Sequence, residues 1–307
     1  MKRSIGSDHG LTLRMFLTMF LLAVVYLIFV GVLLRVGVPV AAIVVIAVVL
    51  LGAQYLFSDR LILASLGAEE VSEAQAPQLH ATVARLAQLT DIPMPRVAII
   101  QSRVPNALAT GRDPKHALVA VTTAIQEQLE PREMEAVLAH ELSHVIHRDM
   151  RVMAMASFFA TVAAFIVQSS LWFGGGFGGG YGGGYGGRGR GGNNEQGSFI
   201  LVVLVAAAVW AVSFVLIRTL SRYREYAADR GSAVITQEPS LLASALLKIS
   251  GRMERIPSQD LRQMQAANAL MLVPASVKGS LAELFSTHPS VEHRVARLQE
   301  LESRLSR

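Results

Sequence analysis

Four long runs without a charged residue are the feature that most constrains how this 307-residue chain folds. As a helix, each run is long enough to cross the roughly 30 Å hydrocarbon core of a membrane. A cleaved signal peptide is an alternative for the first run, but that run is longer than an ordinary signal sequence and a second run follows at once. The runs therefore predict four transmembrane helices, over residues 15–34, 36–58, 152–173 and 196–217.

Composition excludes several classes of protein. Hydrophobic residues make up 52% of the chain and charged residues 17%, below the roughly 25% charge of soluble domains. A largely disordered chain is thereby excluded. The absence of cysteine excludes a disulfide scaffold, a thiolate-held metal cluster and a cysteine nucleophile. Any bound metal must be held by His, Asp or Glu.

The distribution of Lys and Arg predicts the orientation of the chain. The net charge of +5 is compatible with nucleic-acid binding or with basic residues at the cytoplasmic ends of membrane helices. Basic residues precede the first and third runs and follow the fourth, so both termini and the polar segments should be cytoplasmic. The predicted parts are a membrane hairpin, a first cytoplasmic segment, a second hairpin and a second cytoplasmic segment, over residues 1–58, 59–151, 152–217 and 218–307.

The second hairpin contains a glycine-rich loop. Residues 174–192 hold 14 of the 25 glycines and cannot build a packed core. Arg188 and Arg190 between glycines resemble an RGG-type nucleic-acid segment, whereas a flexible connector is the alternative. The predicted orientation places the loop away from the cytoplasm, so we favour the connector and expect no nucleic-acid partner.

The polar segments predict a mixture of helices and short strands. Apolar residues at helical spacing predict a helix from Glu69 to Thr90. Residues 97–100 and 118–121 read as strands, separated by an irregular stretch over 105–115. A further helix is expected over 131–150, with Pro131 in its first turn.

That last helix carries the most informative motif, His140-Glu141-Leu142-Ser143-His144. The His-Glu-x-x-His pattern is typical of zinc metalloproteases when it lies on a helix. Spacing of four residues puts both imidazoles on one face, where each can reach a zinc ion at about 2.0 to 2.1 Å. Glu141 is displaced by roughly 100° around the helix and can accept a proton from a metal-bound water. Two surface histidines are the alternative, which the predicted helix disfavours.

A catalytic zinc site needs a third protein ligand. Val152, which starts the third run, is eight residues after His144, and Ile217, which ends the fourth, is eight residues before Glu225. If both helices continue straight out of the membrane, His144 and Glu225 project about 12 Å from it at matching height. Glu225 is the predicted third ligand, and the alternative is a solvated Arg-Glu charge run. Asp229, one turn further, is placed to hold a ligand histidine by its second ring nitrogen.

His147 and Asp149 follow the motif closely but are not predicted to bind the metal. His147 would extend the row of histidines to about 10.5 Å, too long for one tetrahedral ion. Asp149 is expected to pair with Arg148 or Arg151 rather than to take part in catalysis.

Five segments spread over nearly the whole chain support this interpretation. They are 105–111 (PNALATG), 117–123 (ALVAVTT), 135–144 (EAVLAHELSH), 225–229 (EYAAD) and 286–290 (STHPS). On these residues the sequence resembles the M48 family of zinc metallopeptidases, most of all its HtpX-type bacterial membrane proteases. The resemblance implies an α+β zincin-like protease domain with a small sheet beside the zinc helix, carried on a mainly α-helical integral membrane protein. The glycine-rich loop is longer than the family's usual pattern.

The resemblance also implies roles for individual residues. His140, His144 and Glu225 would be the ligands of one Zn²⁺, and Glu141 the general base. Asn106 and Ala107 would belong to an edge strand that binds extended substrate, although an ordinary turn after Pro105 is the alternative from sequence. His288 would either donate a hydrogen bond to the developing oxyanion or act as a removable fourth zinc ligand.

The expected function is that of a zinc endopeptidase of the bacterial inner membrane, with its active site in the cytoplasm. Its expected substrates are misfolded or damaged proteins, above all membrane proteins, and its surroundings the lipid bilayer. Assembly into a homo-oligomer is one alternative that the sequence leaves undecided. The identity of the metal is another, since cobalt or manganese can occupy similar sites. The alternative is a membrane scaffold or binding protein with a structural or latent zinc site.

Overall fold

The computed structural model describes residues 9–35, 66–111, 113–173, 192–253, 255–256, 272 and 288–305, with single positions at 41, 45, 48, 49, 52 and 64. Its contacts divide the chain into two compact units. Unit 1 comprises Met1–Met15, Tyr55–Met153 and Arg218–Arg307, and unit 2 comprises Phe16–Gln54 and Ala154–Ile217. The boundaries of the predicted membrane hairpins stay a prediction.

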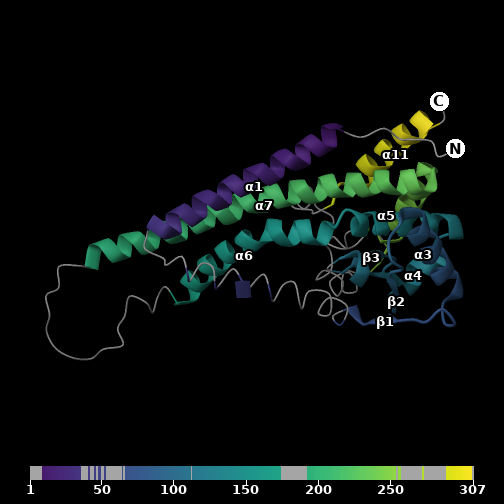
Figure 1. Cartoon of the computed structure of the whole chain (residues 1–307), viewed down its shortest axis with the longest axis horizontal. Helices are drawn as coiled ribbons and strands as arrows, with labels where there is room; N and C mark the ends of the chain where they lie inside the picture. The colour runs from purple at the N-terminus through teal and green to yellow at the C-terminus, as the bar shows by residue number, and fades with distance from the viewer. Residues whose placement is uncertain are drawn as a thin grey trace. The chain divides into compact units, whose positions relative to one another are not determined.

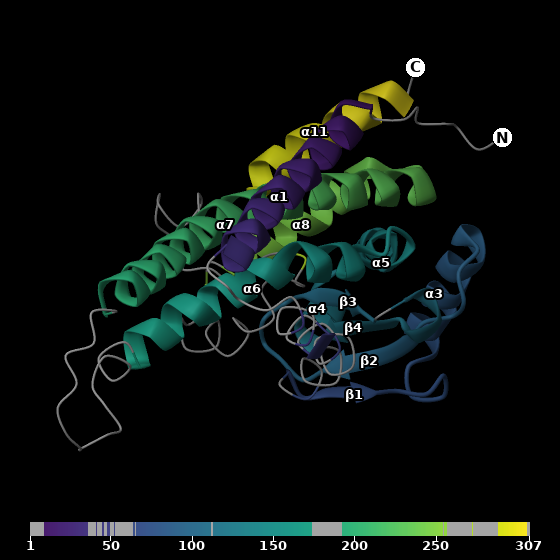
Figure 2. The ribbon, with the colours of Figure 1, turned by 60° about the vertical axis from the view of Figure 1, so that its left-hand side comes forward.

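Unit 1 contains a four-stranded sheet (Figure 2). Its strands are β1 (Ala68–Glu70), β2 (Arg96–Ile100), β3 (Ala107–Thr110) and β4 (Leu118–Thr122). The order is β1-β2-β4-β3, with β2 and β4 parallel and the two outer pairs antiparallel. The two predicted strands, 97–100 and 118–121, lie within β2 and β4. The irregular stretch predicted over 105–115 also contains β3, which forms one end of the sheet.

Helices pack around this sheet. One of them differs from its prediction, because the helix expected from Glu69 to Thr90 is shorter in the structure. Residues 68–70 form β1, and the helix begins only at Pro77, because a turn over Ser72 and Gln75 separates the two elements. The helices of unit 1 are α3 (Pro77–Thr90), α4 (Thr123–Gln128), α5 (Pro131–Ile146), α8 (Pro239–Met253) and α11 (Val291–Leu305), with the last part of α7 (Gly192–Thr236) and a single 3₁₀ turn at Pro114–His116.

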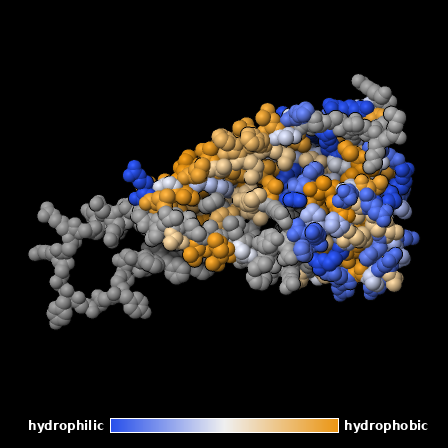
Figure 3. All heavy atoms as spheres, viewed as in Figure 1, coloured by the Kyte–Doolittle hydropathy of each residue, from blue (hydrophilic) through white to orange (hydrophobic). Residues whose placement is uncertain are grey.

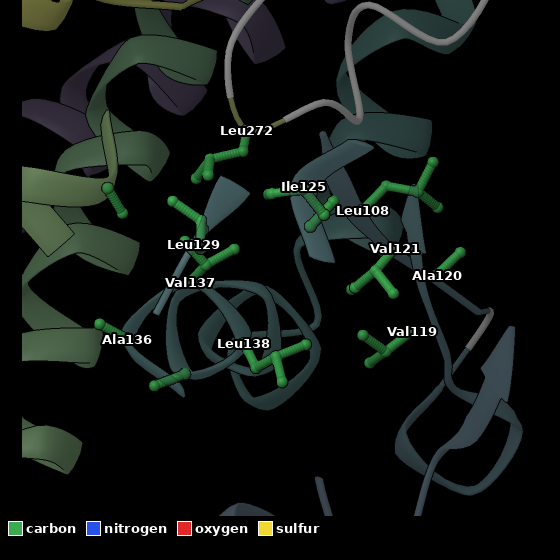
Figure 4. Close-up of a cluster of buried hydrophobic side chains, with 14 of the residues drawn as sticks. Leu108, Val119, Ala120, Val121, Ile125, Leu129, Ala136, Val137, Leu138 and Leu272 are labelled. Carbon is green, nitrogen blue, oxygen red and sulfur yellow. The ribbon is translucent and has the colours of Figure 1, made fainter. Parts of the chain in front are cut away.

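The hydrophobic core lies between the sheet and α5. Figure 4 shows Val119, Val121 and Leu108 from the strands with Val137 and Leu138 from α5, and all five are at most 2% exposed. The core is almost entirely aliphatic. It holds the buried face of α5 rigidly against β3 and β4, which fixes the motif residues on the same helix.

The start of α5 is strongly specified. Pro131 occupies the first turn, and the side chains of Glu130 and Glu133 form a reciprocal capping box. Glu133 also accepts hydrogen bonds from Ser244 and Lys248 of α8, both at 2.7 Å. These contacts tie the beginning of α5 to α8.

The end of α5 differs from the expectation of a helix over 131–150 that runs straight on toward the third uncharged run. The helix ends at Ile146, Arg148 is left-handed with φ 55°, and a new helix, α6 (Asp149–Phe173), begins at Asp149. Backbone bonds from His147 to Ser143 and from Arg148 to Val145 tighten the last turn. A left-handed residue of this kind ends a helix because the ladder of backbone hydrogen bonds cannot continue past it.

Unit 2 consists of helices with apolar exposed faces. α1 (His9–Arg35) and α7 lie side by side in Figures 1 and 2, and the Tyr26 hydroxyl of α1 donates to the Ala156 carbonyl of α6. Phe20, Leu27 and Leu204 are each more than half exposed. Figure 3 shows the hydrophobic surface gathered over α1 and α7. Such a surface suits lipid rather than water.

Among the described residues, two helices are long and apolar enough to cross a membrane, His9–Arg35 and Ile200–Thr236. They overlap the first and fourth predicted spans. The apolar stretch found in α6, Val152–Ala164, is shorter than a span. The predicted span over 36–58 and the glycine-rich loop over 174–192 lie largely outside the described residues. Four membrane crossings therefore stay a prediction.

The last part of α7 packs closely against α5 at Gly231. A Cβ atom added at Gly231 would lie 2.2 Å from Ser143 Oγ and 2.7 Å from Ser143 Cβ. Beside it, the Ser232 hydroxyl donates to the Ala136 carbonyl at 2.7 Å. Glycine permits this approach of the two helices, which sets how far Glu225 of α7 lies from the histidines of α5.

We predict that Gly231→Ala destabilises unit 1 by about 1 to 3 kcal/mol and lowers the metal content, because the added methyl group pushes α7 away from α5. Adding Ser143→Gly to the same chain should restore part of both losses, since it removes the two clashing atoms. Thermal unfolding and metal analysis of the two single variants and the double variant test this. An unchanged melting temperature for Gly231→Ala would contradict the packing argument.

Candidate metal centre

The two histidines of the motif point their Nε2 atoms at each other from one face of α5. His140 is fully buried and His144 partly buried. The two Nε2 atoms are 3.2 Å apart, and the rings are nearly perpendicular. Two nitrogens bound to one tetrahedral ion at about 2.1 Å would lie about 3.4 Å apart. The pair has the spacing of two ligands of one ion.

Glu225 of α7 completes the group. Its Oε2 lies 3.6 Å from His140 Nε2, and its Oε1 lies 3.6 Å from His144 Nε2. Among the described residues, His140, His144 and Glu225 form the one group of three or more possible ligands whose donor atoms all lie within 4.8 Å of one another. Glu225 Oε2 is buried and makes no hydrogen bond, although Arg294 Nη1 lies 3.4 Å from it. A metal ion bound between the three ligands would give this oxygen a direct partner.

Glu141 lies beside this group, at the edge of the sheet. Its side chain is buried, and the backbone N–H of Ala109 in β3 hydrogen-bonds its carboxylate. Burial raises the pKa of Glu141, the neighbouring histidines oppose that shift, and the charge on Glu225 adds to it. A carboxylate with a raised pKa can both accept and return a proton near neutral pH.

Asp229 holds the first histidine, as the helical spacing of α7 predicts. Its Oδ1 lies 3.0 Å from His140 Nδ1, which leaves Nε2 directed at Glu225. Arg294 of α11 binds both Asp229 oxygens, with Nε at 2.9 Å and Nη2 at 2.6 Å. Burial alone would lower the pKa of His140, but its bonds to Asp229 and Glu225 raise it to about 9.

Asp149 holds the second histidine, contrary to the expected pairing with Arg148 or Arg151. Its Oδ2 lies 2.6 Å from His144 Nδ1 and 3.0 Å from Arg224 Nη2. Burial would raise the pKa of Asp149, but His144 and Arg224 hold it below its usual value. The break after α5 brings this side chain back to the histidine, which a straight helix could not do. His147, rejected as a ligand, is exposed.

The remaining predicted site residues also lie in unit 1. His288 is buried, with Nδ1 3.3 Å from Glu225 Oε2. Asn106 is buried just before β3, and Ala107 is the first residue of that strand. The structure thus brings every predicted site residue close to the His-Glu-x-x-His helix or to the edge strand beside it. Their catalytic and binding roles stay predictions.

The sequence analysis missed Arg224, Arg294 and the role of Asp149. A signal for Arg294 existed, because it shares the buried face of α11 with Val295 and Leu298. A charge on an otherwise apolar helix face predicts a buried ion pair. No comparable pattern in the sequence singles out Asp149, whose position depends on the break after α5.

Comparison with known proteins places the chain in a family. Residues 73–302 match Peptidase family M48. The chain belongs to peptidase family M48. It is 57% identical over 305 residues, 99% of either chain, to a Protease HtpX homolog of Moorella thermoacetica. It is 53% identical over 306 residues, the full length of both, to Protease HtpX homolog 2 of Methanosarcina acetivorans.

The chain is therefore a metalloprotease of the HtpX type, which acts on peptide bonds. Among solved structures, the crystal structure of S. mikatae Ste24p aligns with a TM-score of 0.49 and 16% identity, over 93% of this chain and 67% of that one.

We predict that Asp149→Ala weakens zinc binding by roughly 10- to 100-fold, because His144 loses the carboxylate that orients its ring. Asp149→Asn, which keeps an acceptor, should weaken binding less. Competition with a chelating dye measures both affinities. His147→Ala is the matched control in the same segment and should leave the affinity unchanged; an equal loss in that control, or no loss in Asp149→Ala, would contradict the assignment.

Proposed function

We propose that this M48 protein is a membrane-embedded zinc endopeptidase that uses Glu141 as general base and degrades misfolded or damaged proteins, membrane proteins among them. The convergence of His140, His144 and Glu225 beside a buried glutamate carries the proposal. Charge patterning and the two apolar helices support placement in the bacterial inner membrane, with both termini and the site in the cytoplasm.

The donor set fits a zinc ion. Two imidazole nitrogens and one carboxylate leave a fourth position for water, as catalytic zinc sites require. Charge balance supports a divalent cation, because with neutral histidines the buried carboxylates around the ligand group outnumber the buried guanidinium groups there by four to two. These groups are Glu141, Asp149, Glu225 and Asp229 against Arg224 and Arg294. The raised pKa of His140 has the same origin, since in the metal-free chain a proton offsets part of the excess negative charge.

A bound zinc ion would polarise the scissile carbonyl and acidify a water molecule. Glu141 would take the proton of that water and then pass it to the leaving amine. The Ala109 N–H holds the Glu141 carboxylate at the edge of β3, where an extended peptide can add to the sheet through Asn106 and Ala107. His288 faces the same ligand set and could donate to the oxyanion that develops.

His288 also supports a second candidate, a latent or structural site. Its Nδ1 is as close to Glu225 as the ligand nitrogens are. If His288 took the fourth position on the metal, the site would be closed and the chain would act as a membrane scaffold until that ligand moved away.

We predict that Glu141→Gln retains one zinc per chain but cleaves an unfolded model protein at least about 100-fold more slowly, because it loses the general base and keeps the ligands. The proteins are purified in detergent with chelator, and zinc is added to start the assay. Glu135→Gln is the matched control, since Glu135 lies on the same helix and pairs with Arg85 at the surface. It should cleave like wild type.

Cleavage by purified Glu141→Gln at the wild-type rate would overturn the assignment of the base. One zinc per chain in wild type and variant, with cleavage by neither, would favour the latent site, and His288 would then be the next residue to change.

A further inference from the structure

Leu272 makes backbone contacts with the predicted substrate strand. Its N–H donates to Asn106 Oδ1 at 2.8 Å and to the Ala107 carbonyl at 3.2 Å. Its carbonyl accepts a hydrogen bond from Arg294 Nη1 at 2.7 Å. Within 257–287 it is the one residue that the structure describes. The N–H and the carbonyl of Leu272 thus both form hydrogen bonds with residues of the candidate site.

These contacts lie on the outer edge of β3. Antiparallel strands point the peptide groups of successive residues to alternate sides. Thr122 of β4 donates to the Asn106 carbonyl on the inner side, so the Ala107 carbonyl faces outward. The Ala109 N–H, which bonds Glu141, lies on the same outer side because it is two residues further on. Leu272 therefore pairs with the sheet edge two residues along the strand from the residue that contacts the proposed general base.

The carbonyl end of Leu272 lies close to the ligand group. Arg294 Nη1, which donates to this carbonyl, lies 3.4 Å from Glu225 Oε2. One guanidinium nitrogen thus bridges the Leu272 peptide and the proposed metal ligand. An extended substrate residue beside the metal would present its N–H and C=O in the same way.

The side chain of Leu272 fills an aliphatic pocket. It is 1% exposed and belongs to the core cluster. Figure 4 shows it with Leu129, Val137 and Ile125, none of which carries a polar side-chain atom. Such a pocket favours leucine, isoleucine or methionine and excludes charged side chains, which would lose their hydration there.

We propose that Asn106, Ala107 and Arg294 form a substrate subsite that clamps one residue with a large aliphatic side chain, and that Leu272 occupies this subsite as a tethered competitor of substrate. The proposal rests on the proposed function, because it names the substrate class for the same active site. Substrate must displace Leu272 before it can pair with β3, so this residue limits access to the strand.

Peptide binding to an inactive protein tests this without proteolysis. The probe is a fluorescent peptide with the sequence of residues 267–276, and the protein is full-length Glu141→Gln in detergent. Adding Leu272→Ala should tighten binding by about tenfold or more, measured by fluorescence anisotropy, because the competing side chain loses its hold on the pocket. The same peptide with aspartate at the position of Leu272 should bind at least tenfold more weakly.

A matched control separates the subsite from general loosening of the core. Leu86→Ala removes an equally buried leucine of α3 from the same cluster and should not tighten peptide binding. If Leu272→Ala proves too unstable, Leu272→Val, one methylene shorter, should tighten binding by a smaller factor. Equal peptide affinity with and without the Leu272 substitution, or equal binding of the leucine and aspartate peptides, would overturn the proposal.

The assay also separates this proposal from the proposed function. If wild type with zinc cleaves an unfolded protein but Leu272 substitutions leave peptide affinity unchanged, the subsite fails and the protease stands. Tighter peptide binding without any cleavage by wild type supports the subsite and counts against the proteolytic function.

Discussion

The two histidines of α5 can bind one cation only if both Nε2 atoms are directed at the same point, and the ionic network around them holds the rings in that orientation. Each Nδ1 lies within hydrogen-bonding distance of a carboxylate, His140 with Asp229 and His144 with Asp149. Arg294 and Arg224 pair with those carboxylates in turn. Unpaired charges would be too costly at this depth, so each ion depends on the others.

This network explains why elements distant in sequence meet at the site. α5 supplies the histidines and the general base, α7 supplies Glu225 and Asp229, and α11 supplies Arg294. Gly231 allows α7 to approach α5 closely, and the aliphatic core holds α5 on the sheet. A shift of any one helix would pull these buried charges apart, which ties the folding of unit 1 to the geometry of the site.

The sequence predicted the parts of the site that follow from local periodicity. The spacing of His140 and His144, and of Glu225 and Asp229, depends only on helical repeats, and the structure places these residues as that spacing requires. The same logic failed at Asp149, because a left-handed Arg148 interrupts the helix that periodicity extended to residue 150. The apolar face of α11 marks Arg294 as a buried charge, but its partners, like the contacts of Leu272, are tertiary and no local pattern encodes them. The prediction that the helix before Asp91 begins at Glu69 was also wrong, since apolar spacing alone did not distinguish β1 and the turn after it from the first turns of a helix.

The central claim is that His140, His144 and Glu225 hold one zinc ion. The most direct test is the zinc content of purified wild type and of His140→Ala, His144→Ala and Glu225→Ala after dialysis against metal-free buffer, with circular dichroism to verify folding. We predict one zinc per chain in wild type and little in each folded variant, because two remaining ligands hold zinc weakly. A folded variant that retained a full equivalent of zinc would contradict the assignment of the substituted residue as a ligand.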